Sequence, residues 1–179
     1  NAAYATIANK GTYIKPMYYT KILDHNGNVL LENEPETRQV IKPTTAFLLT
    51  DAMVDVVTKG TGASVNFGNM AIAGKTGTTS DYNDVWFSGY TPYYTCTTWA
   101  GYDDNTKLSS SEEKGLAKSR WKKTMAAIHE NLEYRAFETP EGITTATVCN
   151  KSGKLAVDGL CSLDGSAYTE YFATGTVPT

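Results

Sequence analysis

Three strand-like runs follow one another between residues 70 and 102, and this spacing constrains the fold more than any other feature of the chain. The first run, 71–79, begins apolar and ends Lys-Thr-Gly-Thr-Thr. The next two, 84–90 and 93–102, are rich in aromatic and β-branched residues, which favour strands. Because short turns connect the runs, they most simply pair as an antiparallel meander. We therefore expect a β-sheet at the centre of the fold.

A helix is expected on each side of this meander. The segment 43–59 has Pro43 in its first turn, where proline is tolerated, and Lys-Gly-Thr-Gly ends it. A second amphipathic helix is expected over 117–132. The apolar face of the first helix is expected to contain Ala46, Phe47, Leu49, Met53, Val56 and Val57, and that of the second Trp121, Met125, Ile128 and Leu132.

The ends of the chain read as smaller elements. Asn26-Gly27 supplies the positive φ that a tight hairpin needs. His25 lies in that turn and is expected to be exposed, whereas His129 is expected to be a packed or surface histidine. The expected pieces are a helix end over 2–9, an extended run over 12–23, a returning strand over 29–32, a polar link over 33–37, and short extended pieces in a Thr/Gly-rich tail from 137.

Composition narrows the class of protein. The chain is 41% hydrophobic, enough for a core, and its 179 residues suit one domain or a large part of one. Its net charge is -3, and residues of both signs are interspersed along the chain. This argues against nucleic acid or an anionic membrane as the main partner. No apolar run approaches the roughly 20 residues needed to span a bilayer. The opening Asn-Ala-Ala-Tyr reads as mid-helix, so we expect the chain to be part of a longer protein.

The three cysteines and two histidines do not have the spacing of a zinc site, and we expect no metal or other cofactor. Cys149 and Cys161 flank the turn-like segment 151–154. They can form a disulfide or remain two unpaired thiols, and spacing does not decide between these alternatives.

The Lys75-Thr76-Gly77 triplet is the main candidate for chemistry. It does not fit a phosphate-binding P-loop, because position 69 lacks the required glycine and no helix is expected after the lysine. Gly60-Thr61-Gly62 likewise does not continue into a dinucleotide fingerprint. Lys-Thr-Gly on a strand is instead the third signature of penicillin-interacting serine acyl enzymes. A lysine there supplies positive potential, hydroxyls donate hydrogen bonds, and a glycine lets a peptide lie alongside as an added strand.

Several segments together resemble class A penicillin-binding proteins, and the resemblance runs from one end of the chain to the other. It implies an α+β fold, an antiparallel sheet flanked by helices, which is part of a penicillin-binding transpeptidase or β-lactamase-like fold. The helix over 117–132 would cover one face of the sheet, and the helix over 43–59 would lie in the other lobe. The segments that carry the resemblance are 5–16, 61–62, 73–79, 84–92 and 170–179.

The resemblance also implies how the chain is organised. Residues 1–179 would form the C-terminal portion of one transpeptidase domain. Its parts would be a helix end and hairpin over 1–42, the helix over 43–59, the three-stranded meander over 70–102, the helix over 117–132 and a C-terminal extension over 133–179.

The activity implied is that of a D,D-transpeptidase, in which a serine attacks the peptidoglycan stem peptide and β-lactams acylate the same serine. Lys75 would act electrostatically on the serine of the second family motif and on the substrate carboxylate. Thr76, Gly77 and Thr78 would bind substrate, and the Thr78 N–H would form half of the oxyanion hole. The implied partners are the stem peptide, β-lactams and the N-terminal half of the domain.

The resemblance further implies a place in the cell. The parent protein would be anchored by an N-terminal membrane helix, with this chain on the extracytoplasmic side and a glycosyltransferase domain further upstream. An exported setting would favour a bridge between Cys149 and Cys161, although a partner beyond Thr179 is an equal alternative.

The nucleophilic serine is expected to lie before Asn1, so that the chain alone is inactive. Three segments spell earlier family motifs by chance: 64–66 spells Ser-x-Asn, and 111–114 and 119–122 spell Ser-x-x-Lys. The two Ser-x-x-Lys matches follow Lys-Thr-Gly in the sequence instead of preceding it, and 64–66 lies too close to it. Two other functions remain open: a D,D-carboxypeptidase or β-lactamase of the same fold, and a non-catalytic β-lactam sensor or peptidoglycan-binding module.

Overall fold

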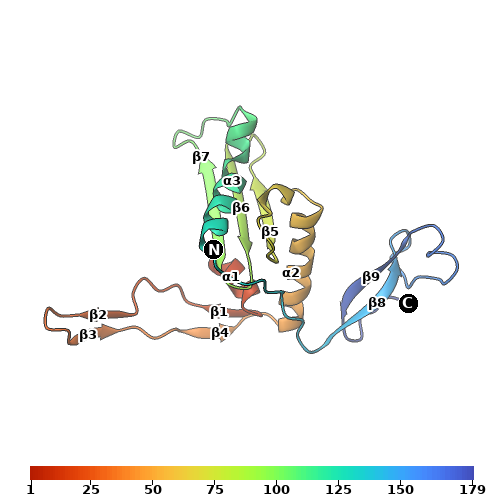
Figure 1. Cartoon of the computed structure of the whole chain (residues 1–179), viewed down its shortest axis with the longest axis horizontal. Coiled ribbons are helices and arrows are strands. Elements are labelled where there is room, and N and C mark those ends of the chain that lie inside the picture. Colours follow the sequence, from red (N-terminus) through yellow and green to blue (C-terminus); the bar gives the residue numbers. More distant parts are fainter.

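The computed structural model describes residues 1–179 and shows a central body with two projecting hairpins (Figure 1). The body contains a sheet of three antiparallel strands in the order β5-β6-β7, which confirms the meander and the α+β class. The first strand begins at residue 73, two residues later than the expected run 71–79. The bounds of these strands are Ala73–Thr78 for β5, Asp84–Tyr90 for β6 and Thr95–Gly101 for β7.

Helix α3, Ser111–Ile128, covers one face of the sheet. Trp121 is fully buried there, and its ring meets that of Phe87 edge-on with centroids 5.0 Å apart. The expected bounds 117–132 are wrong because a capping box, in which Ser110 and Glu113 satisfy each other's backbone N–H groups, starts the helix earlier. Ile128 is exposed, contrary to expectation, because the helix ends there.

Helix α2, Pro43–Thr58, packs against β5 within the same body, so the expectation that it lies in another lobe is wrong. Its Met53 is buried with Ala73 and Tyr90. Thr50 faces the sheet, and its hydroxyl lies 2.7 Å from the Tyr90 hydroxyl. Leu49, expected on the apolar face, is exposed. Thr50 takes the buried position because the buried Tyr90 hydroxyl needs a hydrogen-bond partner.

The other face of the sheet is partly covered by the short helix α1, Ala2–Ala8. Thr97 on β7 donates a hydrogen bond to the Asn1 side chain and lies 3.0 Å from the Ser88 hydroxyl. The rings of Trp86 and Trp99 lie side by side on this face and remain about half exposed.

A long arm projects from one side of the body in Figure 1. The expected run 12–23 is broken into two strands. Residues 37–39 form a further strand that pairs back on the first, although Thr37 was expected to end a polar link over 33–37. Its turn is held by Asp24, which accepts backbone hydrogen bonds from Asn26 and Asn28. His25 is exposed as expected. The strands are β1 (Thr12–Ile14), β2 (Lys21–Leu23), β3 (Val29–Glu32) and β4 (Thr37–Gln39).

A second hairpin lies on the opposite side of the body in Figure 1. It consists of β8, Ile143–Cys149, and β9, Ala167–Ala173, joined in continuous antiparallel register. Its contact with the body includes the rings of Phe47 and Tyr171, 5.1 Å apart. None of the helices combines the length and apolar character needed to cross a bilayer.

Candidate active site

Strand β5, which carries Lys-Thr-Gly, pairs with β6 on one side only. The Thr79 N–H donates to the Asp84 carbonyl across the end of this pair. In an antiparallel ladder, every second residue of a strand hydrogen-bonds a given neighbour. Counting back from Thr79, residues 77 and 75 therefore face β6, and the N–H and C=O groups of Thr76 and Thr78 point to the free edge. The strand therefore presents unpaired backbone donors and acceptors at the position where the sequence places the motif.

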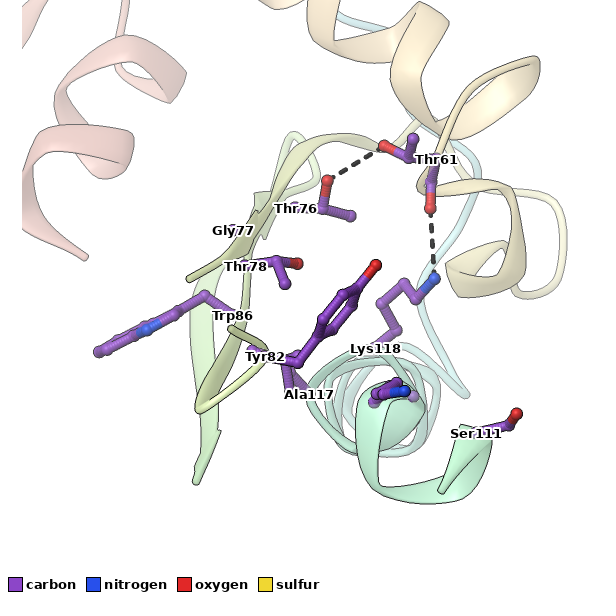
Figure 2. A pocket seen from close by; sticks show the side chains of 12 residues that line it. Thr61, Thr76, Gly77, Thr78, Tyr82, Trp86, Ser111, Ala117 and Lys118 are labelled. Atoms are coloured by element: carbon purple, nitrogen blue, oxygen red, sulfur yellow. Dashed lines mark hydrogen bonds between the residues drawn. The ribbon is translucent and has the colours of Figure 1, made fainter. Parts of the chain in front are cut away.

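The side chains of Thr76 and Thr78 lie in a cavity of about 410 Å³ between β5 and the first turns of α3 (Figure 2). Gly77 also lines it, whereas Lys75 does not, because alternate side chains of a strand point to opposite faces. The cavity is lined by Thr61, Thr76, Gly77, Thr78, Tyr82, Val85, Trp86, Ser111, Lys114, Gly115, Ala117 and Lys118.

Lys75 is exposed, and its ammonium group turns back toward the free edge of β5. The Nζ atom donates to the Thr76 carbonyl at 3.0 Å and lies 3.4 Å from the Thr76 hydroxyl. A positive charge therefore lies beside the unpaired backbone groups of the strand. It can interact with an anionic or polarised group that approaches that edge.

Two residues distant in sequence position the Thr76 hydroxyl. The Thr61 hydroxyl lies 3.0 Å from it, and the Lys118 ammonium group donates to the Thr61 carbonyl at 3.3 Å (Figure 2). Sequence reasoning placed Thr61 after the end of a helix and in the family resemblance, but it assigned no contact with Thr76 and missed Lys118. The one signal was that Lys114 and Lys118 are four residues apart and so share a helix face.

Tyr82 forms another wall of the cavity, and sequence reasoning missed it too. Its backbone has φ of +61°, a conformation uncommon for a bulky residue. Hydrogen bonds on both sides hold it: its N–H donates to the Thr79 carbonyl, and its own carbonyl accepts from Leu108. The Lys114 ammonium group lies 4.8 Å from the centre of the Tyr82 ring.

The cavity has a positive electrostatic character. Two lysines and three threonine hydroxyls contribute to its lining, and no carboxylate does. Hydroxyl and ammonium groups with no competing anion suit a carboxylate ligand, since charge-assisted hydrogen bonds are the strong ones. The arrangement can therefore hold an extended peptide at the edge of β5 with an acidic group in the cavity.

None of the serines in the three chance motifs behaves as a nucleophile with a lysine base. The hydroxyls of Ser64, Ser111 and Ser119 make no hydrogen bond to a lysine ammonium group, and Figure 2 shows the Ser111 hydroxyl directed away from Thr76. Asn66, the last residue of the Ser-x-Asn match, donates its amide to the Val57 carbonyl near the end of α2. Asn66 therefore has a local structural contact at the end of α2.

The chain matches two family models. One, described as the penicillin-binding protein transpeptidase domain, covers residues 2–126, and the other, the penicillin-binding protein 1A C-terminal domain, covers 139–179. Among curated relatives, penicillin-binding protein 1A of Clostridium tetani is 41% identical over 99% of this chain and 23% of its own length. Penicillin-binding protein 1A/1B of Bacillus subtilis is 33% identical over 98% of this chain and 21% of its own length.

Solved structures show the same relationship. Penicillin-binding protein 1A from Haemophilus influenzae superimposes with a TM-score of 0.86 at 25% identity, covering 99% of this chain and 32% of that one. PonA1 from Mycobacterium tuberculosis superimposes with a TM-score of 0.69 at 29% identity, covering 78% of this chain and 40% of that one. An imipenem acyl-enzyme complex of M. tuberculosis penicillin-binding protein A shares the fold, with a TM-score of 0.52 at 21% identity over 70% of this chain and 30% of that one. The chain spans about a quarter of the length of the curated relatives it matches.

Proposed function

The chain belongs to the penicillin-binding protein transpeptidase family, and on that premise we propose that it forms one wall of a serine-type D,D-transpeptidase site. That site would cross-link peptidoglycan and be acylated by β-lactams. The observation that carries the proposal is the free edge of β5, where the backbone groups of Thr76 and Thr78 point outward beside a cationic cavity. An extended stem peptide can pair with such an edge as an added strand.

Gly77 supports this binding mode. A Cβ added at position 77 would lie 3.1 Å from the Trp86 Cβ, so a larger residue would press on the neighbouring strand. A glycine also leaves the backbone open to close approach by another chain. We propose that the stem peptide lies along β5 with its terminal carboxylate held by the Thr76 and Thr78 hydroxyls.

The proposed reaction proceeds through an acyl-enzyme. A serine oxygen adds to the carbonyl carbon of the penultimate D-Ala, and the terminal D-Ala leaves with a proton on its amine. An amine of a second stem peptide then attacks the ester and releases the serine. The Thr78 N–H stabilises the developing oxyanion. The Lys75 ammonium group acts electrostatically on the serine of the second family motif and on the substrate carboxylate.

We propose that the nucleophile lies in the rest of the domain, because no serine hydroxyl of residues 1–179 hydrogen-bonds a lysine ammonium group. Residues 1–179 would be the C-terminal portion of that domain, with 133–179 as an extension, and inactive alone. The active site would lie on the extracytoplasmic side of the cell membrane, where peptidoglycan is found, in a protein anchored by an N-terminal helix. No metal or other cofactor enters the proposed reaction.

The test uses the whole parent protein and a fluorescent penicillin. Thr76→Val keeps the shape of the side chain and removes one hydrogen bond to a charged group. That loss, about 1.5–3 kcal/mol, should slow acylation about 10- to 150-fold. Ser119→Ala is the matched control, because Ser119 is exposed on α3 and lies outside the cavity, and it should acylate at the wild-type rate.

Two results would contradict the proposal. One is stable labelling of the isolated 179-residue chain, which would place a nucleophile within it. The other is an unchanged acylation rate in Thr76→Val, which would separate the cavity from the chemistry. Comparing cross-linking with hydrolysis in the parent protein distinguishes a transpeptidase from a carboxypeptidase of the same fold.

A further inference from the structure

The loop that joins β8 to β9, residues 150–166, is held by few packed side chains. Cys161 and Ser166 are its only buried residues, and its larger apolar side chains are exposed. Those exposed side chains are Leu155, Val157, Leu160 and Leu163. A hairpin connection of this length is unusual, and a hydrophobic core does not explain how this loop keeps its shape.

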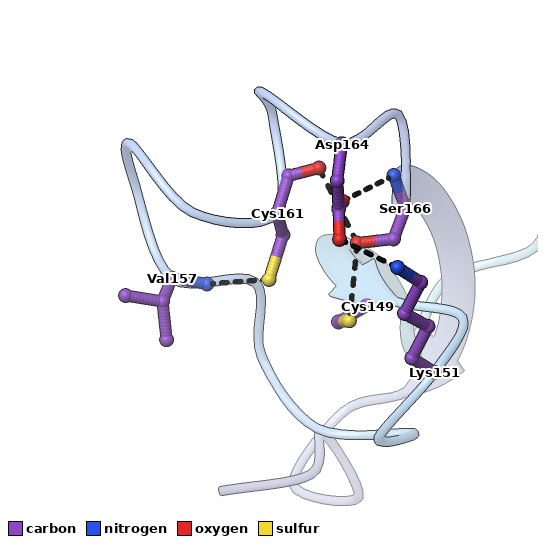
Figure 3. A network of polar contacts seen from close by, with 6 residues as sticks. All are labelled: Cys149, Lys151, Val157, Cys161, Asp164 and Ser166. Carbon is purple, nitrogen blue, oxygen red and sulfur yellow. Dashed lines mark hydrogen bonds and ion pairs between the residues drawn. The ribbon is translucent and has the colours of Figure 1, made fainter.

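Two buried cysteines, Cys149 and Cys161, lie at the base of this loop (Figure 3). Cys149, the last residue of β8, has its sulfur 3.4 Å from the Ser166 hydroxyl oxygen, which in turn lies 3.3 Å from the Cys161 carbonyl oxygen. The Cys161 carbonyl also accepts from the Ala167 N–H, and Ala167 is the cross-strand partner of Cys149. The backbone of Cys161 is thus tied to the residue opposite Cys149.

The surroundings favour thiolate chemistry at Cys149. The Ser166 hydroxyl, 3.4 Å from its sulfur, contributes most to lowering the pKa of Cys149 to about 6, and the nearby N–H groups of Ser152 and Lys151 and the Cys161 thiol act in the same direction. A thiolate is the nucleophile in thiol–disulfide exchange. Cys96, the remaining cysteine, lies on β7 in the central sheet and is distant from this hairpin.

We propose that Cys149 and Cys161 are the reduced form of an intramolecular disulfide that closes the loop. The two sulfurs are free thiols in this structure. Closing the bond requires the sulfurs to approach to about 2.05 Å. The loop can supply that movement because nearly all of its side chains are exposed. The inference does not depend on the proposed transpeptidase activity.

The oxidant is a disulfide, either of low molecular weight or on a protein. The Cys149 thiolate attacks one sulfur of that disulfide, forms a mixed disulfide and displaces a thiolate. Cys161 then loses its proton, and its sulfur attacks the Cys149 sulfur, which expels the second thiolate. Two electrons and two protons pass from the cysteines to the oxidant, which leaves as two thiols.

The experiment incubates the protein with oxidised glutathione and maps peptides without reduction. We expect one species, lighter by about 2 Da for the two hydrogens lost, with Cys149 and Cys161 joined and Cys96 free. Trypsin cleavage after Lys154, inside the closed loop, should slow about tenfold or more on oxidation, because the bridge limits local opening. Cys96→Ser should behave as wild type in both assays.

Three outcomes would overturn the inference. They are bridges to Cys96 or between chains, a lasting glutathione adduct on Cys149 beside a free Cys161, and trypsin cleavage that oxidation does not slow. Because the wild-type protein gives the decisive mapping, the result does not require a cysteine variant to fold. Cys161→Ser adds a second check: it should retain the glutathione adduct at Cys149, since the resolving thiol is gone.

Discussion

Gly74, the residue directly before Lys75, allows β5 to lie against the core, and replacing it by alanine tests this directly. A Cβ at position 74 would lie 2.6 Å from the Phe87 Cζ and 3.0 Å from the Ser88 carbonyl oxygen, where ordinary contacts are 3.4–4 Å. The Phe87 ring cannot swing away easily, because it is fully buried and the Trp121 ring packs edge-on against it. Overpacking of this kind costs about 1–3 kcal/mol.

Gly115→Ala is the matched control for this change. Gly115 lies within α3, and nothing would come within 4 Å of its added Cβ. The two variants alter the unfolded chain in the same way, so the difference between them reports the folded state. Alanine in an open helical position should stabilise the fold by about 0.5–1 kcal/mol. The two variants should therefore differ by about 1.5–4 kcal/mol, with opposite signs relative to wild type.

The assay is urea unfolding of the 179-residue chain, followed by tryptophan fluorescence. With a slope of about 2 kcal/mol per molar urea, Gly74→Ala should unfold about 0.5–1.5 M earlier than wild type and Gly115→Ala slightly later. In the parent protein, Gly74→Ala should also slow penicillin acylation, because the strand that carries Lys75 is displaced. A midpoint for Gly74→Ala equal to or above that of Gly115→Ala would refute the close-packing argument.

Three further predictions concern single contacts. Thr50→Val should destabilise the chain by about 1–3 kcal/mol, because it leaves the buried Tyr90 hydroxyl unpaired. Tyr90→Phe should cost only about 0.5–1.5 kcal/mol, because the Thr50 hydroxyl still donates to the Ala46 carbonyl. Urea unfolding of both variants checks this order. The Tyr102 hydroxyl and two backbone N–H groups hold the pKa of Glu113 at about 2, below its ordinary 4.5. The lowered pKa contributes stability above pH 4.5 that is lost as the pH falls toward 2, so unfolding curves of wild type and Glu113→Gln should converge on acidification. Thr61→Val should slow penicillin acylation of the parent several-fold while its melting temperature stays within a few degrees, because Thr61 is exposed and its hydroxyl contacts only Thr76.

Local pattern predicted the central sheet well because its three strands are adjacent in sequence and their composition is strongly β-forming. The capping box of Ser110 and Glu113 was also readable, and overlooking it placed the start of α3 six residues late. The packing of α2 was not readable in this way. Thr50 is buried only because Tyr90, forty residues away, brings a hydroxyl to the same interface.

The residues of the candidate site likewise fall into those that local sequence predicted and those that only the fold brings together. Thr76, Gly77 and Thr78 were predicted as a contiguous motif, and the structure places all three on one cavity. Lys118 and Tyr82 reach it from other elements, and neither has a local signal that separates it from a surface residue. A lysine on the polar face of a helix normally reads as solvent-exposed, so only the folded chain shows that Lys118 contacts Thr61.

The open edge of β5 has a consequence beyond substrate binding. Unpaired strand edges also accept strands from other molecules, and proteins commonly use a charge at the edge to discourage such aggregation. Here the Lys75 ammonium group lies over the Thr76 carbonyl and occupies one of the exposed acceptors. The same lysine would therefore act as a gatekeeper against self-association. Lys75 would then be selected for solubility as well as for chemistry. An apolar residue in its place would leave the six-residue edge strand β5 without a charge to oppose pairing with other molecules.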